Sequence, residues 1–328
     1  MKPDTSSDIV FRRAGPQDAE AITDLMKQSL GEENTEKSVD FWRWKHEENP
    51  FGSSSVLLAW ADDRLVGIRA FMRWDWAGRQ RTFRALRAVD TATHPDYRGR
   101  GIFKRLTLSL VEECKREGYD FIFNTPNEQS RPGYLKMGWS TVGRLPLRMA
   151  VLKPWEIALA KLRGGGGAVP ATKEVAEDNV GTELLNGAER AGWLSAIRGQ
   201  EQWRTPVTAA FLKWRYLDCP VRTYWLHGEA DEYLIFYYLR EQQFGVELRL
   251  VHCLTRPGYE ASFRRGIGQL RRKYRPTVIT AAASVTGLPF YFLPSLPLGL
   301  ILTFRELNCG TPPRITNWAY ELGDMELF

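Results

Sequence analysis

Short apolar runs alternate with amphipathic stretches along the first half of the chain, a pattern typical of a domain that mixes strands and helices. The apolar runs predict strands at Ile9–Arg13, Val56–Trp60, Arg64–Trp74, Thr82–Thr93 and Asp120–Asn124. Helical spacing predicts helices after Gly15, over Phe41–Gly52 and over about Gly101–Glu117.

The second half of the chain repeats this pattern. Phe41-x-x-Trp44-Lys45-His46-x-x-x-Pro50 recurs as Phe211-x-x-Trp214-Arg215-Tyr216-x-x-x-Pro220. The strand–turn–strand segments 56–71 and 224–239 are also alike, as are Leu145-Pro146-Leu147 and Leu296-Pro297-Leu298. Three similar blocks in the same order predict two copies of one fold. The alternative is a chance similarity between aromatic-rich strands.

Four consecutive glycines, Gly164–Gly167, mark the predicted boundary between the two copies. A run of glycines packs poorly and is typical of a linker. We therefore expect a first domain over residues 1–160, a linker over 161–180 and a second domain over 181–328.

The composition restricts the function and the compartment. The formal net charge of +6 favours an anionic ligand but is too small to indicate nucleic-acid binding. The four cysteines are far apart and the amino terminus has no apolar signal core. We therefore expect a cytoplasmic protein without a disulfide framework or a metal site. Residues Pro276–Phe304 carry no charge, but three prolines interrupt them, so buried strands are expected there rather than a membrane span.

The segment Thr91–Phe103 holds the most informative chemistry. A strand ends at His94-Pro95, and the loop Arg98-Gly99-Arg100-Gly101 leads directly into a helix. The first turn of a helix has unpaired N–H groups and a partial positive charge. Glycines allow a ligand close to the backbone, and the arginines add positive charge. This pattern predicts a site for a phosphate or pyrophosphate, with a plain strand-to-helix turn as the alternative.

Two motifs make residues 8–152 resemble the GNAT (GCN5-related) N-acetyltransferase superfamily. Its signature Arg/Gln-x-x-Gly-x-Gly/Ala is matched by Arg98 and Gly101, although Phe103 replaces the last small residue. Its second element, Asn-x-x-Ala-x-x-x-Tyr-x-x-x-Gly-Phe, is matched by Asn127, Ser130, Tyr134, Gly138 and Trp139. The resemblance implies an α/β (α+β) fold with a mostly antiparallel mixed sheet, a splayed parallel strand pair and flanking helices, present here as two tandem GNAT-like domains.

The resemblance also implies an acyl-CoA site and a role for each matching residue. Acetyl-CoA would lie between the splayed strands, with its pantetheine amides on the main chain of Thr91, Ala92 and Thr93. Its pyrophosphate would bind the N–H groups of Arg98, Gly99, Arg100, Gly101, Ile102 and Phe103. Asn127 and Ser130 would lie near the pantetheine arm. Tyr134 would be the general acid that protonates the leaving thiolate. Tyr134 could instead be a buried aromatic residue, and Asn127 a helix cap.

The general base is not fixed by the sequence. Asp90 on the central strand is the main candidate, and Glu47, Glu48, His46 and His94 are others. Each of these could also be a surface or structural polar group, because acid–base catalysis depends on geometry. The aromatic residues around the first helix pair could line an acceptor pocket or belong to the core: Phe41, Trp42, Trp44, Trp74 and Trp76.

The second copy is expected to have lost the phosphate loop. The position that corresponds to Gly101 is Gly258, in a loop with Arg256 but without paired glycines. Arg265-Gly266-Ile267-Gly268 is similar to the signature, but it falls inside a predicted helix and is expected to be a basic helix face. The second domain would then shape the acceptor pocket or hold the first copy in place. We expect an N-acetyltransferase with a small-molecule or peptide amine acceptor; a non-catalytic acyl-CoA sensor or scaffold is the alternative.

Overall fold

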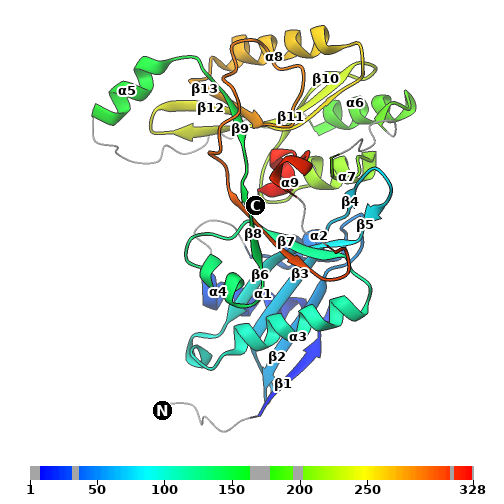
Figure 1. The fold of residues 1–328 in the computed structure, drawn as a ribbon, viewed down its shortest axis with the longest axis vertical. Helices are drawn as coiled ribbons and strands as arrows, with labels where there is room; N and C mark the ends of the chain where they lie inside the picture. Colours follow the sequence, from blue (N-terminus) through cyan, green and yellow to red (C-terminus); the bar gives the residue numbers. More distant parts are fainter. Residues whose placement is uncertain (1–7, 32–36, 163–177, 195–201, 311–313, 327–328) are drawn as a thin grey trace. The chain divides into compact units, whose positions relative to one another are not determined.

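The computed structural model describes residues 8–31, 37–162, 178–194, 202–310 and 314–326, which form a mixed α/β fold (Figure 1). The chain divides into two compact units. Unit 1 comprises Met1–Gly143 and Ile301–Arg314, and unit 2 comprises Arg144–Leu300 and Ile315–Leu327. No helix among the described residues is long and apolar enough to cross a membrane.

Unit 1 is built on a mixed sheet with the strand order β1-β2-β3-β6-β7-β14-β8. The pairs β1/β2, β2/β3, β3/β6 and β7/β14 are antiparallel, whereas β6 and β7 are parallel. The strands are β1 Ile9–Arg13, β2 Ser55–Ala61, β3 Arg64–Arg73, β6 Ala85–Thr93, β7 Phe121–Asn124, β14 Ile301–Glu306 and β8 Ser140–Arg144.

The helices of unit 1 follow its apolar periodicity. They are α1 Ala19–Leu30, α2 Val39–His46, α3 Ile102–Arg116 and α4 Arg131–Lys136, with the 3-10 turns η1 Pro16–Asp18 and η2 Pro95–Tyr97. α1 buries Ile22, Leu25 and Met26, which recur at helical spacing. The aromatic helix α2 is shorter than expected and ends at His46 rather than near Pro50.

The expected strand Thr82–Thr93 is divided into two pieces. β5 (Thr82–Phe83) pairs with β4 (Trp76–Ala77) in a separate hairpin, and β6 begins only at Ala85. Between them the N–H of Arg84 donates to the Asp120 carboxylate at 2.7 Å instead of to a strand. A side-chain acceptor from another segment therefore interrupts the strand, and the local sequence does not show it.

Unit 2 contains a second mixed sheet with the order β10-β11-β12-β13-β9. Its pairs are antiparallel, antiparallel, parallel and antiparallel, which is also the sequence of pairings in β2-β3-β6-β7-β14. The strands are β10 Trp225–Glu229, β11 Tyr233–Gln242, β12 Gly245–Thr255, β13 Val278–Ala282 and β9 Leu147–Val151. The helical elements are α5 Pro154–Leu162, α6 Asp178–Arg190, α7 Ala209–Leu212, η4 Lys213–Leu217, α8 Glu260–Tyr274, η5 Ile315–Asn317 and α9 Leu322–Met325.

Each half of the chain contributes one strand to the sheet of the other half. β9, from the first half, pairs with β13 in unit 2, and β14, from the second half, pairs with β7 in unit 1 (Figure 1). The units therefore differ from the expected domain boundaries: residues 144–160 lie in unit 2, and residues 301–314 lie in unit 1. Gly164–Gly167, the expected linker, is outside the described residues.

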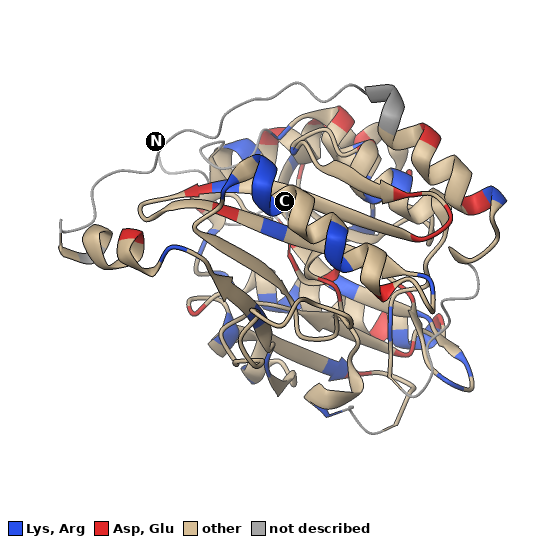
Figure 2. Ribbon diagram, turned by 90° about the horizontal axis from the view of Figure 1, so that it is seen from above, with Lys and Arg blue, Asp and Glu red and all other residues tan. Residues whose placement is uncertain are grey.

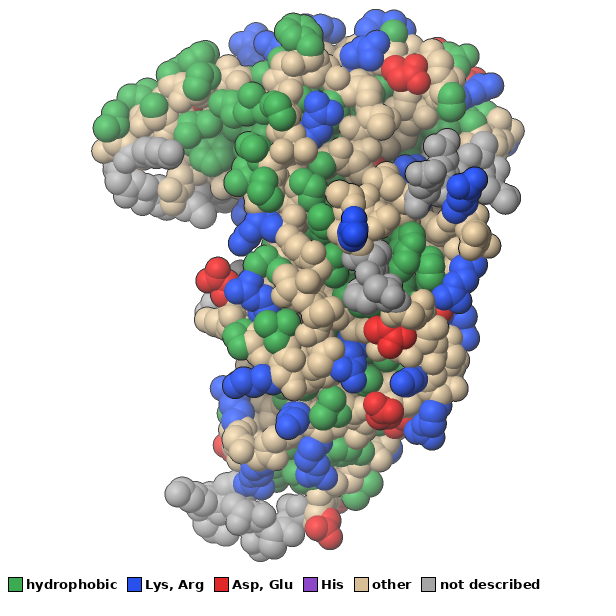
Figure 3. Space-filling model, viewed as in Figure 1, with side chains coloured by type: hydrophobic (Ala, Val, Ile, Leu, Met, Phe, Trp, Pro, Cys, Tyr) green, Lys and Arg blue, Asp and Glu red, His purple; other side chains and the backbone are tan. Residues whose placement is uncertain are grey.

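Both units have buried apolar cores, and unit 2 also exposes large apolar side chains. The core of unit 1 lies mainly between α3 and the sheet. On α5, Trp155, Leu159 and Leu162 are exposed, and apolar side chains are visible over this helix in Figure 3.

Candidate functional site

The parallel strands β6 and β7 separate after three residue pairs. The register runs from Ala85 opposite Phe121 to Arg87 opposite Phe123, yet β6 continues to Thr93. The N–H of His94 donates to the carbonyl of Val66 in β3. Successive backbone groups along a strand point in opposite directions. The N–H and C=O groups of Thr91 and Thr93 therefore point toward the side that β7 has left, whereas those of Ala92 point toward β3.

The loop before α3 presents unpaired N–H groups. Gly99 (φ +80°) and Gly101 (φ +72°) are both left-handed, and a Cβ at either position would meet open space. The first helical bond is from Arg105 N–H to Gly101 C=O. The N–H groups of Gly99 to Phe103 have no hydrogen-bond partner within the described residues. This loop has the donors, the space and the helix terminus that an oxyanion needs.

Two arginines give the loop its positive charge. Arg98 is exposed and donates to the carbonyl of Ser29 at 3.1 Å, and the Arg100 guanidinium lies 4.6 Å from the centre of the Tyr97 ring. Neither forms an ion pair with any residue in the described part of the chain. Both charges therefore remain available to an anionic ligand.

Tyr134, in the short helix α4, is buried beside this loop. It is 5% exposed, and its hydroxyl oxygen accepts a 2.9 Å hydrogen bond from Arg69. Its ring meets Phe103 and Trp139 edge-on, with centroid distances of 6.1 and 5.2 Å. Phe103, which replaces the small residue of the family signature, thus packs against the tyrosine expected to be the acid.

Asn127 and Ser130 form a turn before α4. The Asn127 Oδ1 accepts from both the N–H and the hydroxyl of Ser130, each at 2.8 Å. The side chain of Asn127 therefore stabilises the turn before α4, whereas the N-cap residue of the helix is Ser130. The side-chain NH₂ group of Asn127 still has no partner among the described residues.

The geometry disfavours Asp90 as the general base. Its carboxylate lies 2.7 Å from Lys45 Nζ and 2.8 Å from His46 Nε2 on α2. Burial by itself would raise the pKa of Asp90, but Lys45 and His46 outweigh it and hold that pKa far below its usual value. A carboxylate that resists protonation this strongly is a poor proton acceptor.

The other candidate bases are also held in structural contacts or lie at the surface. His46 is buried between Asp90 and the Ser54 hydroxyl, and its burial lowers its pKa. His94 accepts from the Asp96 N–H, and burial together with Arg64 lowers its pKa. Glu47 and Glu48 are exposed. None of them contacts Tyr134.

The aromatic residues around α2 mainly form core. All five are at most 7% exposed: Phe41, Trp42, Trp44, Trp74 and Trp76. Phe41 and Trp42 also border a cavity of about 10 Å³ beside Lys45, His46 and Asp90, which is about the space of one water.

Sequence reasoning missed Arg69, which β3 places against Tyr134. Its signal was visible as one cation within the apolar run Leu65–Phe71. A charged residue inside a strand whose neighbours are all apolar indicates a special partner, because burying a charge is costly.

Comparison with known proteins agrees with this geometry. Residues 10–142 match the sequence profile of the acetyltransferase (GNAT) domain. Over these residues the chain is similar to the GNAT acetyltransferase domain. No curated protein matches the chain. The match to the GNAT domain supports an acyltransferase enzyme.

Solved structures show that the GNAT fold extends over most of the chain. A probable N-acyltransferase from Enterococcus faecalis V583 aligns over 92% of this chain and 74% of its own, with a TM-score of 0.61 and 11% identity. A GCN5-related N-acetyltransferase from Anabaena variabilis aligns over 92% of this chain and 73% of its own, with a TM-score of 0.60 and 14% identity. Eis1 from Mycobacterium abscessus aligns over 92% of this chain and 74% of its own, with a TM-score of 0.54 and 12% identity. At such identities the similarity establishes the fold alone.

Two features of the sheet in unit 1 have counterparts in the sheet of unit 2. β12 and β13 pair from Glu247/Val278 to Arg249/Thr280 and then separate, as β6 and β7 do. In both units the central strand also carries a register shift, at Asp90 and Val89 in β6 and at Val251 in β12. Counting from the first pair, His252 takes the place of Asp90.

The buried contact between helix and central strand recurs with different chemistry. In unit 1, His46 contacts Asp90 at 2.8 Å, and in unit 2 Tyr216 contacts His252 at 3.0 Å. Because unit 2 keeps the contact while exchanging both residue types, we interpret this contact as a structural link between the helix and the shifted strand.

Proposed function

We propose that the protein is an N-acetyltransferase that moves acetyl from acetyl-CoA to an amine on a small molecule or peptide in the cytoplasm. The observation that carries the proposal is the row of unpaired N–H groups from Gly99 to Phe103, which follows Arg98, includes Arg100 and lies beside diverging strands. A diphosphate fits such a row, and the main chain of Thr91 and Thr93 offers partners to the amides of the pantetheine arm. The four cysteines are free in the structure.

The proposed reaction is direct acyl transfer. The amine attacks the thioester carbonyl, the N–C bond forms, the C–S bond breaks, and the amine loses a proton. Tyr134 is the proposed general acid, giving its proton to the leaving sulfur. Its oxygen already accepts from Arg69, and its own proton has no acceptor among the described residues. The hydroxyl can therefore donate to a ligand. The main chain and Tyr134 position the reactants, which is a large part of catalysis in reactions without a covalent enzyme intermediate.

We propose that unit 2 is a degenerate copy that binds no coenzyme. Its loop has one left-handed glycine, Gly258, whose N–H donates to the Glu260 side chain at 3.2 Å. Hydrogen bonds from the N–H groups of Glu260 and Gly258 lower the pKa of that carboxylate. An internal anion thus takes the position where a phosphate would bind. Gly266, in the signature-like run within α8, is small because a Cβ would lie 2.4 Å from the Tyr233 hydroxyl.

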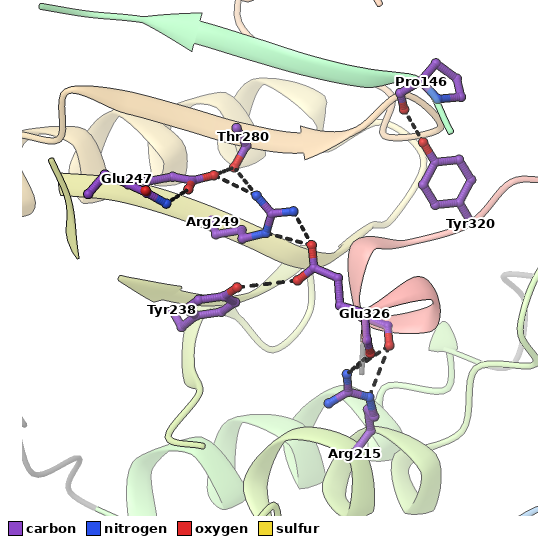
Figure 4. Close-up of polar contacts among 10 residues, drawn as sticks. Pro146, Arg215, Tyr238, Glu247, Arg249, Thr280, Tyr320 and Glu326 are labelled. Carbon is purple, nitrogen blue, oxygen red and sulfur yellow. Dashed lines mark hydrogen bonds and ion pairs between the residues drawn. The ribbon is translucent and has the colours of Figure 1, made fainter. Parts of the chain in front are cut away.

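The diverging strands of unit 2 are linked by an ion-pair network (Figure 4). Arg249 on β12 contacts Glu247 at 2.7 Å and also Glu326, which follows α9. Thr280 on β13 donates to Glu247. These side chains join β12 to β13 and to the segment after α9 at the level where the two strands are still paired. This arrangement supports a scaffolding role for unit 2.

Lysines and arginines are most frequent in unit 2 along α8, where Arg264, Arg265, Arg271 and Arg272 are exposed (Figure 2). This matches the expected basic helix face.

The second candidate function is a non-catalytic acyl-CoA sensor. The observation that favours it is the pairing of Asp90 with Lys45 and His46, which occupies the carboxylate expected to be the base. The two functions separate in one experiment: acetyl-CoA should raise the melting temperature in either case, since a ligand of the native state stabilises it. Release of free CoA with a panel of amines, followed by thiol titration, is expected only of an enzyme. No thermal shift would contradict both functions.

Charge reversal in the loop should weaken coenzyme binding. We expect Arg100→Glu to raise the Kd for CoA at least about tenfold, because it replaces an attraction to the diphosphate by a repulsion. Isothermal titration measures the effect. Arg256→Glu, in the corresponding loop of unit 2, is the matched control and should leave the Kd unchanged. Equal effects of both variants would count against the assignment of the loop in unit 1.

A further inference from the structure

Arg69 is a fully buried cation without an acidic partner. It lies on β3 with no exposed surface, and none of the described residues forms an ion pair with it. Its two terminal nitrogens donate to neutral oxygens, the Val89 carbonyl at 3.1 Å and the Tyr134 hydroxyl at 2.9 Å. Its Nε has no partner. Aromatic rings cover the guanidinium, with centroids 4.7 Å away for Phe71, 5.3 Å for Tyr134 and 5.8 Å for Phe103.

Such an arrangement is unfavourable for the folded chain by itself. Removing a charge from water is costly, and carbonyls, hydroxyls and ring faces compensate only in part. The other buried cations differ in their partners: Lys45 has Asp90, whereas Arg215, also fully buried, donates to the Gly323 carbonyl at 2.9 Å and to the Tyr224 hydroxyl at 3.2 Å. A buried arginine that donates to neutral oxygens therefore occurs in both units, and Arg69 is distinguished by its hydrogen bond to the Tyr134 hydroxyl beside the loop before α3.

The second copy shows that the fold does not need an arginine here. Arg69 pairs with Thr91, six residues after the first parallel pair of the central strand, and in unit 2 the corresponding position opposite Cys253 is Ile235. Ile235 is also fully buried. The unit without the phosphate loop has an apolar residue, and the unit with the loop has the cation.

The hydrogen bond between Arg69 and the Tyr134 hydroxyl has a fixed direction. A guanidinium can only donate hydrogen bonds. The Tyr134 oxygen is therefore the acceptor, and its own hydrogen must point away from Arg69. No described residue accepts that hydrogen. Arg69 thus fixes both the place of the oxygen and the side on which its proton is available.

We propose that Arg69 is a positioning residue that makes Tyr134 an effective proton donor, an inference that rests on the proposed acyl transfer. As the C–S bond breaks, the Tyr134 proton passes to sulfur, giving the CoA thiol and leaving a phenolate oxygen. The uncompensated charge of Arg69 lies 2.9 Å from that oxygen and stabilises it. In a buried site such a charge has a strong effect on a developing anion. Tyr134 then regains a proton from the one that the amine releases, so the protons balance.

A double-mutant cycle tests this inference. The variants are Arg69→Met, Tyr134→Phe and the double variant, measured for kcat, for KM of acetyl-CoA and for melting temperature. We expect Arg69→Met to lower kcat about 10- to 100-fold and to change KM by less than about threefold. The reason is that the variant loses an interaction with the transition state and none with the bound substrate. In the Tyr134→Phe background the same change should lower kcat by less than about twofold, because its partner is already absent.

Arg69→Lys provides the conservative variant. It keeps the charge and one donor, and we expect it to recover part of the kcat that Arg69→Met loses. Methionine has a similar length and no charge to desolvate, so Arg69→Met should not lower the melting temperature markedly.

The outcomes are distinguishable. An equal loss of kcat from Arg69→Met in both backgrounds would overturn the role of Arg69 and leave the acyl transfer standing. A wild-type protein that binds acetyl-CoA but releases no CoA with any amine would overturn the inference together with the proposed enzyme. A large fall in melting temperature for both Arg69 variants would show that Arg69 is structural.

Discussion

Tyr134→Phe is expected to lower kcat by about 10²-fold or more, the usual contribution of a general acid. The variant loses only the hydroxyl, since Phe103 and Trp139 still hold the ring edge-on. The donor is therefore expected to bind with an unchanged KM and Kd. Steady-state turnover of acetyl-CoA and titration with CoA measure the two quantities separately.

A control for this variant is available in unit 2. Tyr237 is buried there, and its hydroxyl lies 2.9 Å from that of Tyr274. Tyr237→Phe removes a hydroxyl of similar burial from outside the acetyltransferase domain, and we expect kcat to be unchanged. If Tyr134→Phe kept full turnover, Tyr134 would be a packing residue and another group would have to protonate the thiolate.

The second large effect concerns stability rather than turnover. Lys45 is 5% exposed and pairs with Asp90, so Lys45→Met leaves a buried carboxylate with only His46 beside it. Removing one partner of a buried pair costs about 3–5 kcal/mol of the free energy of unfolding. Denaturant unfolding measures the loss. The double variant Lys45→Met/Asp90→Asn should recover part of it, because no buried charge then remains.

The contribution of Asp90 to the free energy of unfolding should decrease at low pH. Its pKa is lowered in the folded protein, while an aspartate in the unfolded chain titrates near about 3.9. The stability that Asp90 contributes is therefore fully present above about pH 4 and is lost progressively as the pH falls further. The difference in unfolding free energy between wild type and Asp90→Asn should shrink in that range.

An exposed pair serves as the control for the stability experiment. Lys213 contacts Asp218 at 2.6 Å at the surface of unit 2. Lys213→Met should cost less than about 1 kcal/mol, as exposed pairs do. A similar cost for Lys45→Met would mean that the Lys45–Asp90 pair is as solvated as a surface pair.

Local pattern was sufficient for most elements and for the glycine-rich turn before α3. The apolar spacing of α1 and the strand–turn–strand of β2 and β3 follow from side-chain periodicity, which depends only on neighbours in the chain. The glycines at 99 and 101 signal left-handed backbone in the same way, and the structure has both with positive φ. These features lie within a few consecutive residues, so the sequence contains all the information that they need.

The strand exchange and the state of Asp90 could not be predicted in this manner. Leu147–Val151 and Ile301–Glu306 look alike, and nothing in either segment says which sheet it joins. Asp90 looks like a free carboxylate until α2, from elsewhere in the chain, places Lys45 and His46 against it. Pairings between distant segments decide both features.

By itself, the sequence determined the mixed fold, the repeated pattern and a loop suited to a diphosphate, because local periodicity, turn chemistry and helix termini are properties of short segments. Only the tertiary structure decided which partners the buried charges have. It placed Lys45 beside Asp90 and left Arg69 with the Tyr134 hydroxyl. The physical reason is that the chemistry of a charged group depends on its solvation and its nearest partners, and both are set by packing between elements far apart in the chain.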